Sequence, residues 1–167
     1  GSANITFTAV WNGTQYVVIY SSNGGTGVTP TAPNRLLGET FTVASAGSLT
    51  KSGYSFLGWM ESGTAYLAGN TFTMPARNVT LIAQWSGLVY TITYSSTGAD
   101  SGSPSRASDS FTFGASAISL PTAGTMVKAG YAFGGWSETT TALGNSYSAT
   151  ANVTLSPVWT PTTQTFS

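Results

Sequence analysis

The sequence carries an internal repeat, which constrains its fold more than any other feature. The segment 78–81, Asn-Val-Thr-Leu, returns 74 positions later at 152–155, and the aromatic block 53–59 returns 77 positions later at 130–136. The two shifts differ slightly, as expected where loops take insertions. Each copy is longer than the roughly 20–50 residues of a solenoid repeat. We therefore expect two folded units, each with a core of its own.

The repeat also predicts where the domains begin and end. Asn4 and Trp11 stand one period before Asn78 and Trp85, so the chain is expected to begin with the last strand of a preceding copy. The predicted domains are this final strand (residues 3–11), module 1 (14–86), module 2 (87–160) and a linker (161–167). A strand that lacks its own sheet is expected to pair with an exposed edge of module 1 or to contact another molecule.

The composition excludes several classes of function. Hydrophobic residues make up 41% and aromatic residues 13% of the chain, enough to form packed cores. Charged residues make up only 6%. Binding to nucleic acid or to a membrane surface requires clustered Lys or Arg, which this sequence lacks, and no apolar run approaches the roughly 20 residues needed for membrane insertion. Without Cys or His, we expect no thiol nucleophile, no metal site built on thiolates and no cofactor.

The alternation of side chains predicts a mainly β fold. Residues 90–94 alternate aromatic or aliphatic side chains with threonines, and residues 79–85 place Val, Leu, Ala and Trp on one face. Helical periodicity is limited to one or two turns at 46–51 and 123–128. Pro157 cannot donate a hydrogen bond to a sheet, so its strand is expected to lie at an edge or to carry a bulge.

Three motifs recur in the same order and resemble a known family. They are a Tyr-x-Val/Ile-x-Tyr strand, a Gly-Tyr-x-Phe-x-Gly-Trp block and an Asn-Val-Thr-Leu-x-x-x-Trp strand. Their residues are Tyr16, Tyr20, Gly53, Tyr54, Phe56, Gly58, Trp59 and Trp85 in the first copy, and Tyr90, Tyr94, Gly130, Tyr131, Phe133, Gly135, Trp136 and Trp159 in the second. This order resembles the Listeria–Bacteroides repeat, the B repeat of internalin-type proteins. The resemblance implies a small β-grasp-like α+β module with a reduced helix, used in tandem in secreted or wall-anchored bacterial surface proteins and without catalytic residues.

The aromatic residues of the block have two interpretations. Trp59, Trp136, Tyr54 and Tyr131 could form a platform that stacks against sugar rings. We favour the alternative that these side chains are core, because aromatic residues dominate the buried surface of small domains. The repeated tyrosines, glycines and tryptophans are then packing residues rather than the lining of a binding cleft.

A Lys, a Glu and an Asn also recur in each copy. They are Lys51, Glu61 and Asn78 in module 1, and Lys128, Glu138 and Asn152 in module 2. We interpret the Lys and Glu as a surface ion pair in each copy, worth about 0–1 kcal/mol. The alternative is an intramolecular Lys–Asn isopeptide bond of the kind known in bacterial adhesins, which an intact mass without loss of ammonia would exclude. The ion pair is favoured, because an Asn beside a strand more often caps a turn.

No set of residues in the sequence predicts catalysis. A hydrolase without His or Cys would need paired carboxylates or a Ser–Lys pair, and Glu61 and Glu138 repeat in different copies rather than forming one site. The chain is therefore expected to be a non-catalytic spacer or stalk that holds an adhesin domain away from the bacterial cell wall. The alternative is a module that binds a host protein or glycan by edge-strand addition or through a loop surface. In both cases we expect an extracellular location and contacts with neighbouring repeats of the same chain.

Overall fold

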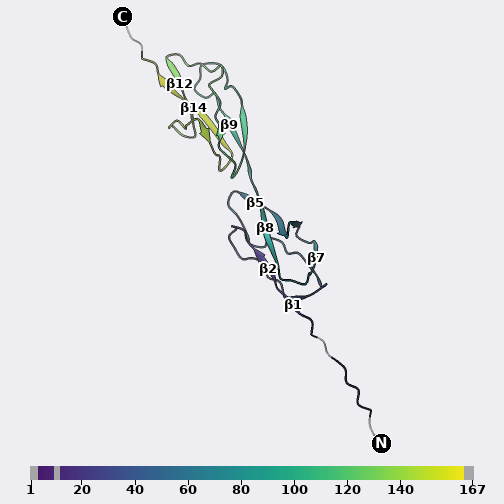
Figure 1. Ribbon diagram of the computed structural model, residues 1–167. Coiled ribbons are helices and arrows are strands. Elements are labelled where there is room, and N and C mark those ends of the chain that lie inside the picture. The colour runs from purple at the N-terminus through teal and green to yellow at the C-terminus, as the bar shows by residue number, and fades with distance from the viewer. Residues whose placement is uncertain (1–3, 10–11, 164–167) are drawn as a thin grey trace. The chain divides into compact units, whose positions relative to one another are not determined.

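The computed structural model describes residues 4–9 and 12–163. The chain divides into two compact units, Gly1–Ser86 and Gly87–Ser167, which contain module 1 and module 2. Both modules consist of β-strands joined by turns and loops, and the described residues contain no helix (Figure 1). The fold is therefore mainly β, with two tandem repeats.

Module 1 contains a four-stranded sheet and two short strand pairs. Its strands are β1 (Gln15–Tyr16), β2 (Val18–Ser21), β3 (Arg35–Leu36), β4 (Thr40–Thr42), β5 (Tyr54–Glu61), β6 (Thr64–Tyr66), β7 (Thr71–Thr73) and β8 (Val79–Gly87). The main sheet has the order β2-β8-β5-β6, and the pairs are β1-β3 and β4-β7. Strands β2 and β8 are parallel, with Val18 opposite Val79 and Tyr20 opposite Leu81.

Module 2 repeats the central pairing of module 1. Its strands are β9 (Val89–Tyr94), β10 (Ser108–Thr112), β11 (Ile118–Ser119), β12 (Tyr131–Ser137), β13 (Ser146–Tyr147) and β14 (Val153–Pro161). The main sheet has the order β10-β9-β14-β12, and β11 pairs with β13. Strands β9 and β14 are parallel, with Ile92 opposite Val153 and Tyr94 opposite Leu155. The first long strand of each module thus lies beside the last one and runs in the same direction.

The inner face of each main sheet follows the predicted period of two. In module 1, Val79 and Leu81 are at most 1% exposed, while Thr80 between them is exposed. In module 2, Ile92 and Leu155 are fully buried. Burying one such side chain contributes about 1.5–3 kcal/mol relative to leaving it in water. Each module has a hydrophobic core made from its own strands.

The segments 46–51 and 123–128 are not helical, so the expected short helix is wrong. Each forms a single turn closed by a backbone hydrogen bond of 3.1 Å. Gly47 and Gly124 in these turns have φ values of +60° and +62°. A positive φ cannot continue a right-handed helix, so the glycine ends the turn before a helix can form.

The positions of Pro157 and Pro161 in β14 only partly match those expected from the sequence. β14 lies between β9 and β12, so Pro157 is not in an edge strand. The register of β12 against β14 shifts between Phe133 and Trp136, opposite Pro157, so the expected bulge is present but in the partner strand. Pro161 closes β14 instead of starting the linker 161–167, because it is paired with β12; residues 164–167 lie outside the described part of the chain.

The N-terminal segment shows no pairing in its described part. Residues 4–9 form no strand, and the side chains of Ile5 and Phe7 are 76% and 91% exposed. The expected pairing with an edge of module 1 is therefore not found for these residues. The remainder of the predicted 3–11 strand, Ala3, Val10 and Trp11, lies outside the described residues.

Candidate functional site

The central tryptophan of each aromatic block is buried and hydrogen-bonded. Trp59 and Trp136 are 0% and 1% exposed. Trp59 Nε1 donates to the carbonyl oxygen of Ala44 at 2.8 Å, and Trp136 Nε1 donates to that of Pro121 at 2.7 Å. These bonds satisfy the polar end of each indole, which would otherwise be costly to bury. The interpretation of both tryptophans as core is confirmed, since neither ring offers a face to a sugar.

Further aromatic rings extend this packing within each module. Phe56 contacts Trp59 and Trp85 edge-on, with ring centroids 5.1 and 5.4 Å apart, and the equivalent contacts of Phe133 are 5.4 and 6.1 Å. Of the other repeated aromatic residues, Tyr20 and Tyr94 are buried and Tyr16, Tyr90, Trp85 and Trp159 are half-buried. Edge-to-face pairs of this kind add about 0.5–1.5 kcal/mol each beyond the area they bury. The repeated aromatics therefore stabilise each module.

The tyrosine of each block lies at the surface rather than in the core. Tyr54 is half-buried and Tyr131 is 41% exposed, and neither is among the residues that form or pack against the core of its module, so the prediction that they are core is wrong. Lys51 Nζ lies 4.7 Å from the Tyr54 ring centroid, and Lys128 Nζ lies 4.5 Å from that of Tyr131. An ammonium over an aromatic face is stabilised without leaving water, which explains why these rings remain at the surface. The repeated Lys is a partner of the tyrosine.

The expected Lys–Glu ion pair is replaced by a different one in module 1. Arg77 binds the Glu61 carboxylate through two nitrogens, the shorter contact being 2.6 Å. Hydrogen bonding to Arg77 lowers the pKa of Glu61 below its ordinary value against the opposing effect of burial. Module 2 has Ala151 one period after Arg77, and Glu138 is exposed. The Glu61–Arg77 ion pair is therefore specific to module 1. The recurrence of Lys51 and Glu61 in both copies did not predict it.

The repeated asparagines join the first strand of each module to the last. Asn78 Oδ1 accepts a hydrogen bond from Val17 N at 2.8 Å, and Asn152 Oδ1 accepts one from Thr91 N at 2.9 Å. Each asparagine side chain thereby adds one hydrogen bond to the backbone hydrogen bonds that pair the parallel strands. The structure does not bring together the residues of the hypothetical isopeptide, because Lys51 lies over Tyr54, Glu61 binds Arg77 and Asn78 binds Val17.

Module 2 contains a polar cluster that sequence reasoning missed. Tyr94 donates its hydroxyl hydrogen to Asp109 Oδ2 at 2.7 Å, and Arg106 Nε donates to the same oxygen at 2.7 Å. Arg106 also binds the carbonyl oxygen of Ser119. In module 1 the equivalent Tyr20 hydroxyl accepts from Ala44 N instead. The signal in the sequence was the Arg-x-x-Asp spacing of 106–109, which only module 2 carries.

This cluster predicts that module 2 loses stability in alkaline solution. Burial, followed by the hydrogen bond to Asp109, raises the pKa of Tyr94 to about 12, against about 10 for an ordinary Tyr. Folding thus favours the neutral phenol, so its stabilising effect is complete below pH of about 10 and is lost as the pH rises through about 12. Urea unfolding of module 2 at pH 8 and pH 11 should show the loss, and Tyr94→Phe should remove that pH dependence at a cost of about 1 kcal/mol at pH 8. Tyr20→Phe serves as the control, and an unchanged pH dependence in Tyr94→Phe would refute the assignment.

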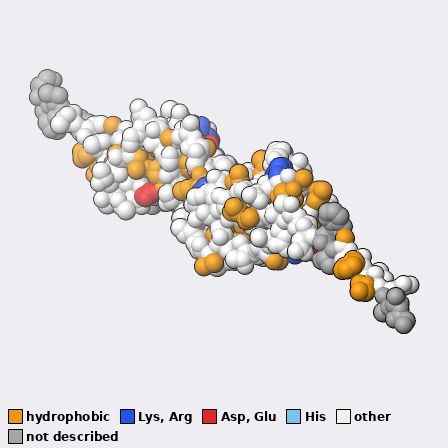
Figure 2. All heavy atoms as spheres, turned by 60° about the horizontal axis from the view of Figure 1, so that its bottom comes forward, with side chains coloured by type: hydrophobic (Ala, Val, Ile, Leu, Met, Phe, Trp, Pro, Cys, Tyr) orange, Lys and Arg blue, Asp and Glu red, His pale blue; other side chains and the backbone are white. Residues whose placement is uncertain are grey.

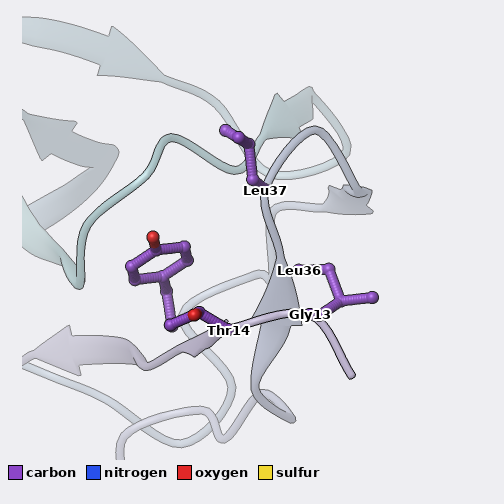
Figure 3. Close-up of a pocket in the computed structure, with 5 residues that line it drawn as sticks. Gly13, Thr14, Leu36 and Leu37 are labelled. Carbon is purple, nitrogen blue, oxygen red and sulfur yellow. The ribbon is translucent and has the colours of Figure 1, made fainter. Parts of the chain in front are cut away.

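Two surface hollows of the described residues are lined by uncharged side chains. The one in Figure 3 has a volume of about 380 Å³ and lies between the segment of Gly13 and Thr14 and that of Leu36 and Leu37. A second, of about 440 Å³, lies in module 2 beside β12 and is lined by uncharged residues. Charged side chains are sparse on the face shown in Figure 2. Within the described ranges, no three His, Cys, Asp or Glu side chains are grouped as metal ligands would be.

These features define a class of protein: tandem β modules in which the residues that recur serve packing and strand pairing. The chain belongs to the Listeria-Bacteroides repeat domain family, whose model matches residues 16–84 and 90–158. This is a repeat family of bacterial surface proteins. The two matches span most of both modules and contain the three recurring motifs except their final residues, Trp85 and Trp159, which lie one residue beyond each match. The resemblance inferred from the sequence is confirmed.

One curated relative is similar to part of the chain. It is a protein of Evansella cellulosilytica whose name calls it a Gly-rich membrane protein, and it is 33% identical over 118 residues. The match covers 66% of this chain but 13% of that protein. No solved structure matches the chain. Among the described residues, no helix is long and apolar enough to cross a membrane.

Proposed function

We propose that this chain is a non-catalytic spacer segment of an extracellular bacterial adhesin-type protein. The observation that carries the proposal is the parallel pairing of β2 with β8 and of β9 with β14. When the first and last strands of a module are parallel, the chain enters at one end of the sheet and leaves at the other. Each module then adds about the length of its last strand, nine residues in β8 or roughly 30 Å, to the distance between its neighbours.

The same pairing supports a load-bearing role. A force applied to the two ends of module 1 pulls β2 and β8 in opposite directions along their length. The bonds of this pairing are then loaded together rather than one after another, including those at its start, Val79 N to Val17 O at 3.0 Å and Val17 N to Asn78 Oδ1 at 2.8 Å. A folded module thus keeps its length under tension, whereas a disordered linker collapses and extends as a random coil.

We propose as well that each module is a reduced β-grasp. In a β-grasp sheet the first and last strands are parallel neighbours, with the second strand beside the first and the third beside the last. Module 2 has this order in β10-β9-β14-β12. Module 1 has the first, last and third strands in the order β2-β8-β5, while its β3 pairs with β1, just before β2, in a separate two-stranded sheet. The turns at Gly47 and Gly124 occupy the place in the chain where the helix of a full β-grasp would stand. A crystal structure with a full helix at either turn would refute the reduced form of the fold.

Stretching single molecules of the whole chain tests the spacer function. We expect two unfolding events per chain, each releasing roughly 20–25 nm of contour length, because each module holds about 70 folded residues of up to 3.6 Å each. Asn78→Ala should lower the force of one event and leave the other unchanged, since it removes the bond to Val17 N at the start of the β2–β8 pairing. Asn70→Ala, which also removes an accepted backbone hydrogen bond but at a turn outside this pairing, is the matched control.

The proposal would be overturned by a chain that extends without unfolding events, as a random coil does. It would also be overturned by equal effects of Asn78→Ala and Asn70→Ala, which would show that the parallel strands do not bear the load. Neighbouring repeats of the same chain are the partners that a spacer requires, and a catalytic role is no part of the proposal.

A further inference from the structure

The main sheet of module 1 has apolar side chains on its outer face. Ile19 on β2 and Ile82 on β8 are 49% and 40% exposed, although the residues beside them in the strands point into the core. Ile82 lies opposite Ser21, two residues from Ile19 on the same face of β2, so the two side chains are diagonal neighbours across the strand pair. The outer face thus carries an apolar stripe where a solvated sheet would carry polar residues.

The stripe continues into a shallow apolar hollow on the same face. Leu57 and Leu67, 55% and 61% exposed, line this hollow of about 200 Å³ together with Met60 and Gln84. Gln84 lies two residues after Ile82 on β8, which places the hollow next to the stripe. We call these side chains the outer patch: Ile19, Leu57, Met60, Leu67 and Ile82.

Module 2 lacks every member of the outer patch. The equivalent positions hold Thr93, Gly134, Ser137, Gly144 and Ser156. Gly144 is assigned through its neighbour Leu143, whose N–H binds Trp136 O as Tyr66 pairs with Trp59 in module 1. The inner face is retained at the same time, with Val153 and Leu155 in place of Val79 and Leu81. The fold therefore does not require an apolar outer face, and the patch has some other role in module 1.

The absence of charge on the outer patch indicates what kind of surface can bind it. All five side chains are uncharged, and the neighbouring Gln84 is neutral. Two copies of one surface that meet about a twofold axis place each residue against its own kind, which repels when the surface is charged and is favourable when it is apolar. Open sheet faces also pack on one another, about 10 Å apart. We propose that the outer patch of module 1 binds the outer patch of a second copy of this chain.

The size of the patch predicts that this association is weak. A stable dimer buries about 800 Å² on each partner, whereas the patch consists of five partly exposed side chains. Dimers are then expected only at high protein concentration, as occurs when many copies are held on one surface. The inference goes beyond the proposed spacer role, since it links separate chains side by side.

Sedimentation equilibrium of the whole chain between about 10 µM and 1 mM tests the proposal. We expect reversible dimers, and an increase of at least tenfold in the dissociation constant for Ile19→Thr combined with Ile82→Ser. These are the residues that module 2 carries, and both sites are exposed, so the variant should fold. Val89→Thr is the matched control, because Val89 is 64% exposed on a strand outside the patch. If the double variant misfolds, Leu67→Ser in the turn after β6 should give the same loss.

Three results would overturn the proposal. The first is a chain that stays monomeric up to 1 mM. The second is equal association of the patch variants and the wild type. The third is loss of the dimer in Ile5→Ser combined with Phe7→Ser, which would assign the association to the exposed N-terminal segment. None of these results changes the outcome expected from the stretching experiment. Failure of this inference and failure of the spacer proposal are therefore distinguishable.

Discussion

Replacing Trp59 with alanine is expected to remove most of the stability of module 1 while leaving module 2 folded. The indole is fully buried, donates a hydrogen bond to Ala44 and packs against Tyr20 with ring centroids 4.7 Å apart. Truncating a buried Trp costs about 3–5 kcal/mol. A small domain has a total stability of about 0.05–0.15 kcal/mol per residue, so this loss is a large part of what a module possesses.

The measurement is urea unfolding followed by residue-specific NMR signals from each module. Trp136→Ala is the matched variant. It should destabilise module 2 and leave module 1 folded, because the contacts of Trp136 repeat those of Trp59. The wild-type chain gives the reference midpoints. Unfolding of both modules together in either variant would contradict the conclusion that each module has its own core.

Replacing Gly58 with alanine is expected to destabilise module 1 by about 2–4 kcal/mol. Gly58 has a φ of +138°, which side chains rarely adopt, and an added Cβ would lie 2.7 Å from the backbone oxygen of Tyr66 on β6. The equivalent Gly135 has a φ of +114°, but its nearest neighbour would be the oxygen of Leu143 at 3.7 Å. Gly135→Ala therefore carries the backbone strain without the clash and should cost about 1–2 kcal/mol.

Thermal unfolding of the two variants, with the same module-specific signals, measures the difference between them. Gly63→Ala is the control for the effect of φ, because Gly63 has a φ of +82° at the turn between β5 and β6 and no atom within 4 Å of an added Cβ. Equal losses for Gly58→Ala and Gly135→Ala would show that the close approach of β6 does not limit this position.

Much of the fold could be predicted from residues that respond to local rules. Strands follow the alternation of side chains, so the burial of Val79 and Leu81 and the exposure of Thr80 could be predicted from their order. The repeat extended each such prediction to a second copy. The turn at 46–51 was predicted as a short helix because the positive φ of Gly47 depends on the path of the chain and not on the composition of the segment.

Partners of polar side chains could not be predicted in the same way. Glu61 lies at the end of β5, and its partner Arg77 lies just before β8, so the two meet only once these strands lie in one sheet. The spacing of Lys51 and Glu61 between copies suggested a pair that the tertiary structure does not form. Tyr54 and Lys51 are closer in sequence, yet their contact depends on how the turn between them folds.

The sequence by itself determined the number of modules, the longer strands that follow a period of two and the tryptophans of each core, because alternation and repetition are properties of the chain order. Only the tertiary structure decided which strands are neighbours, which cation binds Glu61 and which apolar residues of module 1 lie together on its outer face. Those features depend on contacts between residues far apart in the chain, and their geometry is set when β2, β5 and β8 pair in one sheet.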